Sequence, residues 1–157
     1  MTIGFTAVPS LISKKVAAAT AFWNAEGVAL RERGVDVREF RVNRFGAPTY
    51  PELVLAVRRE TLRRERALVR GVLNALTRGT SEALADPDAA LGRIVEASRA
   101  EESLVRAQFE AVRPALAPPV ALDRRALEGW AAFDERFGIL ESRLAVDEAF
   151  DLSLGPR

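Results

Sequence analysis

The stretch that decides the predicted fold lies at residues 16–27 and reads VAAATAFWNAEG. Its first part, residues 16–23, is a continuous apolar run, typical of a strand that is buried on both faces of a parallel sheet. Asn24 follows directly, and its short polar side chain predicts the N-cap of a helix from about Ala25 to Arg33. Gly34 is the expected residue just past that helix. A strand that leads straight into a helix indicates an α/β layer.

Three more stretches have the pattern of strands. Residues 3–8 are mostly apolar, residues 35–42 alternate apolar with charged side chains, and residues 52–57 form another apolar run. A helical turn is expected from Pro9 through Lys15, because Pro is tolerated in the first turn of a helix. Residues 43–51 hold one Gly and two Pro, so we predict a loop or hinge there.

Everything after residue 57 reads as helix. Apolar residues recur at helical spacing over about residues 59–85, and further helix starts are predicted at Asp86-Pro87, at Ser98 and at Asp123. We interpret as core the apolar stripe of the last long helix: Ala126, Trp130, Phe133 and Phe137. Few strands beside so much helix predict an incomplete sheet with uncovered apolar surface.

Composition excludes several classes of site. The 157 residues include no Cys and no His, which removes thiolate nucleophiles, Ser-His-Asp triads and the usual metal ligands. We therefore predict no catalytic residues, no metal and no cofactor. The formal net charge is +1, which gives no general field for nucleic acid. The basic run at residues 58–70 is interleaved with Glu60 and Glu65, so we interpret it as a solvated helix face.

Candidate ligand-binding residues lie where the apolar run meets the predicted helix. Trp23, Asn24 and Glu26 there combine an aromatic, an amide and a carboxylate, a set that suits a planar polar ligand at the carboxyl end of a strand. Trp23 would stack on the ligand, and the other two would form hydrogen bonds. The alternative is that Asn24 is only an N-cap, Glu26 only complements the helix dipole, and Trp23 is core.

The loop offers two further candidates. Phe45 and Tyr50 are aromatic residues on a proline-stiffened connection, as in a hinge that lines a cleft. A plain rigid loop with Tyr50 packed against it is the alternative.

Three quoted stretches together resemble a known family: GF with VP at residues 4–9, AATAFWNAEG at residues 18–27, and FGAPTYPELVL at residues 45–55. They are similar to thiamine-pyrimidine-precursor substrate-binding proteins of ABC importers, within the wider nitrate, sulfonate and taurine binding-protein group. LEGWA at residues 127–131 and the segments around Gly138 and Phe150 also look like that family.

The resemblance implies a partial periplasmic-binding-protein type II fold, α/β with a helix-rich C-terminal part. Residues 1–43 would be a remnant of the second lobe, 44–51 the hinge or crossover, and 52–157 the return strand and helices of the first lobe. An ABC permease and a pyrimidine-like small molecule would be the partners. The family implies an extracytoplasmic protein, periplasmic or lipoprotein, although the chain begins without a signal peptide and would be cytoplasmic if Met1 is the true start.

One departure from the family pattern concerns the backbone. Before the apolar strand the family usually has Gly in the second place of the motif, whereas this chain reads Ser13-Lys14-Lys15. A turn that requires Gly would place Lys14 under backbone strain.

Three functions follow as hypotheses. The first is a solute-binding protein, possibly a truncated form, for a thiamine pyrimidine precursor or a similar heterocycle, with nitrate, sulfonate or taurine as alternative solutes. The second is a pyrimidine synthase, as in fungal relatives that use an active-site His and a pyridoxal phosphate Lys, which this chain's lack of His argues against. The third is a helical interaction module that binds no ligand.

Overall fold

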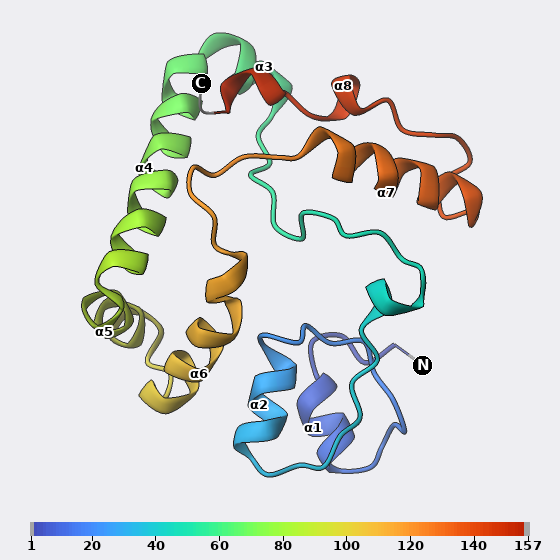
Figure 1. Ribbon diagram of the computed structural model, residues 1–157, viewed down its shortest axis with the longest axis vertical. Helices are drawn as coiled ribbons and strands as arrows, with labels where there is room; N and C mark the ends of the chain where they lie inside the picture. Colours follow the sequence, from blue (N-terminus) through green and yellow to red (C-terminus); the bar gives the residue numbers. More distant parts are fainter. Residues whose placement is uncertain (1, 156–157) are drawn as a thin grey trace. The chain divides into compact units, whose positions relative to one another are not determined.

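The structure is a computed structural model that describes residues 2–155. All of its regular elements there are helices (Figure 1). The α-helices are α1 (Ala7–Ile12), α2 (Glu26–Glu32), α3 (Arg59–Arg64), α4 (Arg66–Ala85), α5 (Pro87–Ser98), α6 (Glu102–Val112), α7 (Arg124–Arg136) and α8 (Val146–Ala149). The short 3-10 helices are η1 (Val42–Phe45), η2 (Arg113–Ala115) and η3 (Leu152–Leu154).

The predicted strands are wrong for residues 2–155. Part of the first, residues 3–8, belongs to α1, and the stretches 16–23, 35–42 and 52–57 have no strand pairing. The physical reason is that a helix satisfies its backbone groups within one segment, whereas a strand needs a second strand beside it. These stretches are apolar, but none of them is paired with a second strand among residues 2–155. Uncovered apolar surface, which was expected, is present at residues 53–57.

Local signals at helix ends were more reliable. The Asp86 carboxylate accepts from the backbone N–H of Ala89 at 3.1 Å and caps α5, while Asp123 caps α7 by accepting from Arg125 N–H at 2.9 Å. Gly34 and Gly138 follow α2 and α7 with φ of +65° and +66°, the left-handed conformation expected past a helix. The predicted cap of α2 is wrong, because Ala25 and not Asn24 occupies that position.

Lys14 adopts the strained conformation that its place in the motif predicts. Its φ is +55°, just after α1 ends, and the backbone N–H of Lys15 closes the turn onto Ser10 C=O at 2.9 Å. L-residues other than Gly lose about 1–2 kcal/mol in this region. The turn therefore strains the backbone at Lys14, whereas Gly in the same position would adopt this φ without strain.

Residues 2–155 divide into two compact units. Unit 1 is the chain up to Glu39 together with Glu82–Leu116, and unit 2 is Phe40–Ser81 together with the chain from Ala117 on. The predicted domain boundaries at residues 43/44 and 51/52 remain a prediction. The two compact units follow other boundaries, and each of them combines two separate stretches of the chain.

Unit 1 has a helical core. Leu91 of α5 packs with Val105 and Phe109 of α6, and the partly buried Val95 and Leu116 pack against this cluster. The helices α1 and α2 bury their own apolar side chains: Ala7, Val8, Val28 and Leu30.

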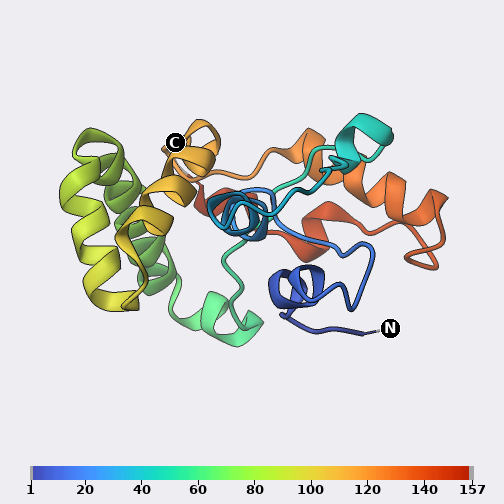
Figure 2. The ribbon, with the colours of Figure 1, turned by 90° about the horizontal axis from the view of Figure 1, so that it is seen from below.

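Unit 2 combines apolar packing with arginine contacts. Leu127 and Ala131 are the buried apolar residues of α7, and α8 lies beside that helix (Figure 2). Val146 of α8 is buried as well. Phe137 was expected in the buried stripe, but its side chain is 60% exposed, with its ring 4.5 Å from that of Phe133 between centroids. The stripe prediction is wrong at that residue, because α7 ends at Arg136. Ala126, Trp130 and Phe133 are half-buried and lie next to the fully buried positions of the helix.

The end of the described chain is hydrogen-bonded to α3 and to the start of α4. Arg66 donates from Nη1 to Asp151 Oδ2 at 2.9 Å and from Nη2 to Ser153 Oγ at 2.5 Å, and Arg59 donates to the backbone oxygen of Glu148 at 2.9 Å. These contacts bring residues more than 80 positions apart together within unit 2.

Candidate functional site

Three of the predicted binding residues lie together in unit 1, in the turn that leads into α2. Glu26 Oε2 accepts from the backbone N–H of Phe22 at 2.9 Å, and Phe22 C=O accepts from the N–H groups of Ala25 and Gly27 at 3.1 and 3.0 Å. The Glu26 carboxylate therefore fixes the shape of the turn and retains lone pairs for a second donor.

Neighbouring residues hold the same turn from outside. Arg31 donates to Trp23 C=O at 3.4 Å and forms an ion pair with Glu39, while Gln108 Nε2 of α6 lies 3.5 Å from Ala25 C=O. Gly27 is packed closely here, since a Cβ added to it would lie 3.1 Å from Glu39 Oε1. The turn is thus held by α2, α6 and residue 39, which gives its side chains a defined setting.

Asn24 carries an unmet hydrogen-bonding group. Its Oδ1 atom is buried and has no hydrogen-bond partner in the described part of the chain. A buried acceptor without a donor costs roughly 1–3 kcal/mol, so such an atom in a folded protein calls for an explanation. Trp23, half-buried, and Glu26 flank this acceptor in sequence.

The other two predicted residues belong to unit 2. Phe45 is 72% exposed, and its ring contacts that of Phe40 at 6.1 Å between centroids. Tyr50 stacks on Trp130 of α7 at 5.2 Å with an interplanar angle of 20°. Tyr50 thus anchors the loop to α7. The structure brings Trp23, Asn24 and Glu26 together and assigns Phe45 and Tyr50 to the other unit.

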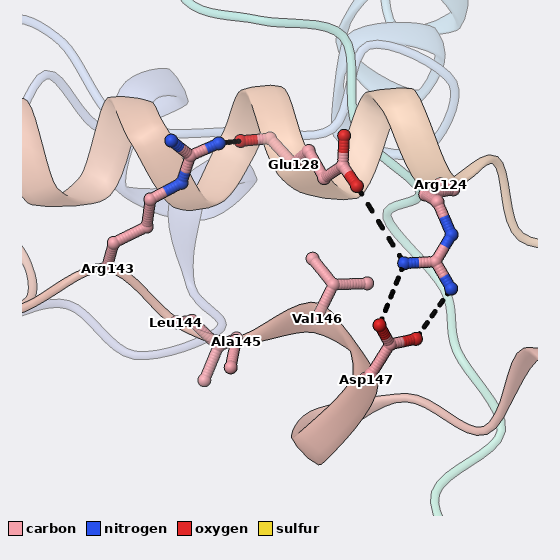
Figure 3. Close-up of a pocket in the computed structure, with 7 residues that line it drawn as sticks. All are labelled: Arg124, Glu128, Arg143, Leu144, Ala145, Val146 and Asp147. Carbon is pink, nitrogen blue, oxygen red and sulfur yellow. Dashed lines mark hydrogen bonds and ion pairs between the residues drawn. The ribbon is translucent and has the colours of Figure 1, made fainter.

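A pocket of about 320 Å³ lies in unit 2 between α7 and the segment of residues 143–147 (Figure 3). Arg124 binds Asp147 with both terminal nitrogens, at 2.5 and 3.1 Å, and lies 3.7 Å from Glu128 Oε1. Arg143 donates to the backbone oxygen of Glu128 at 3.4 Å. The Arg124 guanidinium lowers the pKa of Asp147, and hydrogen bonding to Asp147 raises the pKa of Arg124.

Sequence reasoning missed this pocket. Arg124 and Glu128 have the i, i+4 spacing of a helix-face pair, which is the one signal available. The hydrogen bond from Arg124 to Asp147 joins residues that are 23 positions apart and lie in different helices, so no local sequence pattern predicts it. The pocket's carboxylates and guanidinium groups largely neutralise one another, which favours a structural role for them.

Residues 2–155 offer neither a metal site nor a membrane span. No group of three or more acidic side chains there is arranged to hold a metal ion, and no helix is long and apolar enough to cross a membrane. The turn before α2 is where the unpartnered buried Asn24 Oδ1 coincides with three of the side chains predicted to bind a ligand.

Comparison with known proteins adds one match. A family model described as NMT1/THI5 like matches residues 1–90, more than half of the 157 residues, including the whole turn at residues 22–27. No curated protein and no solved structure gives a significant match.

Proposed function

The chain belongs to the NMT1/THI5-like family, a family of substrate-binding proteins with the periplasmic-binding-protein fold, and we propose that it binds a small nitrogen heterocycle for an ABC importer. A thiamine pyrimidine precursor is the proposed solute. The permease of such an importer is the proposed partner, and an extracytoplasmic location, as is typical of the family, is part of the same proposal.

The observation that carries the proposal is the unpartnered Asn24 Oδ1. An aminopyrimidine presents N–H donors at the edge of a flat ring, which suits a buried amide oxygen and a neighbouring carboxylate. Glu26 is the proposed second acceptor, and Trp23 the stacking surface. Both lie within two residues of Asn24 on the same turn.

Charge in the turn supports a heterocycle over the anionic solutes of the wider group. Arg31, which donates to Trp23 C=O in the turn, is already paired with Glu39, and Glu26 adds a negative charge. A nitrate or a sulfonate would need a free donor cation where the turn offers acceptors. Nitrate and taurine are therefore the comparison ligands in the test below.

Binding without catalysis is proposed, in keeping with a family whose members are generally binding proteins. The synthase alternative needs an active-site His and a cofactor-binding Lys, whereas the chain has no His and its two Lys, Lys14 and Lys15, lie outside the turn.

Calorimetric titration of the 157-residue chain with a hydroxymethyl-aminopyrimidine tests the proposal. We expect binding that Asn24→Leu weakens up to about tenfold, since a net hydrogen bond is worth about 0.5–1.5 kcal/mol and about 1.4 kcal/mol corresponds to a tenfold change in affinity. Glu26→Gln should weaken binding similarly, because the hydrogen bond loses its charge.

Asn74→Leu is the matched control, since Asn74 lies exposed on α4 and its loss should leave the affinity unchanged. Absence of heat with the pyrimidine would overturn the proposal and favour a helical interaction module. Heat with nitrate or taurine instead would keep the binding role and replace the solute.

A further inference from the structure

Residues 52–58, Glu52 to Arg58, form an exposed run between η1 and α3 (Figure 1). Every residue of the run is exposed, although residues 53–57 are all apolar, and Leu53 is 90% exposed. Single exposed apolar residues need no explanation, but a continuous stretch of them marks an interaction surface.

The backbone of the exposed run is also unpartnered. Within residues 2–155, the N–H and C=O groups of residues 52–57 form no backbone hydrogen bond, and the run lies outside every helix. Leu and Val in succession, without Gly or Pro inside, have the composition of a strand. A strand of this kind is completed by another extended segment that supplies donors and acceptors alongside it.

The sequence of the run is complementary to itself in the antiparallel direction. When two copies pair with Leu55 opposite Leu55, Leu53 faces Val57 and Val54 faces Ala56. The same register sets Glu52 opposite Arg58 at both ends. Opposite charges directly across an antiparallel pair stabilise it, and like charges destabilise it.

Neither terminal charge is used elsewhere. In the described part of the chain, Glu52 and Arg58 are exposed and their side chains form no hydrogen bond or ion pair. A parallel, in-register arrangement would instead place Glu52 against Glu52 and Arg58 against Arg58. The charges therefore select the antiparallel register, whose two-fold symmetry gives an isologous dimer.

We propose that the exposed run is a self-association site, at which two copies of this chain form an antiparallel two-stranded pair centred on Leu55. The partner is a second copy because, in this register, each end of its run carries the charge opposite to the one it faces. The pairing supplies the strand partner that the apolar pattern of residues 52–57 requires.

Sedimentation of the full chain over a range of protein concentrations tests the proposal, together with infrared spectra of the amide band. We expect a concentration-dependent dimer with an antiparallel β signal that grows with dimer content. Arg58→Glu should raise the dimer dissociation constant about tenfold, because it creates two repulsive pairs with Glu52. The double variant Glu52→Arg/Arg58→Glu should restore the original value.

Arg64→Glu is the control, since it changes the net charge equally but lies on α3, where Arg64 pairs with Glu60 at 3.0 Å. Leu55→Pro should abolish the dimer by removing the central N–H donor and fixing φ. A chain that stays monomeric at every concentration would overturn the proposal. A dimer that Arg58→Glu and Arg64→Glu weaken equally would overturn it too.

Discussion

The α5–α6 pair of unit 1 and the exposed run of unit 2 are both rich in Leu and Val, yet they end in opposite environments. Leu91 in α5 is 1% exposed, whereas Leu53 in the run is 90% exposed. The difference lies in the backbone. A helix satisfies its own N–H and C=O groups, so two helices can pack as soon as their apolar faces meet. A single extended segment cannot do so, and its apolar side chains stay uncovered until another strand arrives.

The largest expected effect comes from the well-packed side of this comparison. Leu91→Ala removes the most buried side chain of the α5–α6 cluster and should lower the free energy of unfolding by about 2–5 kcal/mol, through lost burial and the cavity left behind. Thermal unfolding followed by circular dichroism measures it. Ile94→Ala on the same helix is the control, because Ile94 is 44% exposed and its loss should cost much less. Equal losses would mean that the cluster is not the core of unit 1.

A smaller effect, of opposite sign, is expected where α1 leads into the apolar residues 16–23. Lys14→Gly should raise the free energy of unfolding by about 1 kcal/mol, because Gly adopts the φ of +55° without strain. Denaturant unfolding of Lys14→Gly and of Lys15→Gly distinguishes relief of strain at residue 14 from a general effect of introducing Gly. Lys15→Gly should destabilise slightly, since its φ is not in the left-handed region. Stabilisation by both, or by neither, would contradict the strained turn.

The smallest expected effect is a pH dependence of the contact at the end of the chain. The Ser153 hydroxyl and then the Arg66 guanidinium, both hydrogen-bonded to Asp151, lower the pKa of that carboxyl below its ordinary value of about 3.9. The stabilisation is fully present above the unfolded pKa and is lost as the pH falls through the lower folded pKa. The melting temperature should therefore fall below about pH 4, and Asp151→Asn should flatten that fall.

Asp36→Asn serves as its comparison, because Asp36 is exposed and forms no ion pair among the described residues. A fall of equal size in both variants would place the pH dependence elsewhere in the chain.

Features that depend on a few neighbouring residues could be predicted from the sequence. The caps at Asp86 and Asp123, the Gly residues past α2 and α7 and the strain at Lys14 all depend on atoms within about one turn. The predicted strands are wrong for residues 2–155, because strand pairing depends on segments that the local pattern does not identify.

The candidate site followed the same division. Trp23, Asn24 and Glu26 are close in space because they are close in sequence, and the turn holds them with its own backbone. The stacking of Tyr50 on Trp130 and the bond from Arg124 to Asp147 join distant positions, which composition and spacing do not reveal. That Asn24 is an unpartnered acceptor and not the helix cap also required the structure, since both roles use the same side chain.

The two Trp residues of the chain are divided between the two units. Trp23 lies in the turn before α2, whereas Trp130 lies in α7 and stacks on the Tyr50 ring. Each unit therefore carries its own intrinsic fluorophore, and the emission of a single-Trp variant reports on one unit alone. The fluorescence emission of Trp23 reports on the candidate binding turn, and the emission of Trp130 reports on the stacking of Tyr50 against α7. The chain's own optical properties thus separate events in one unit from events in the other, without any added label.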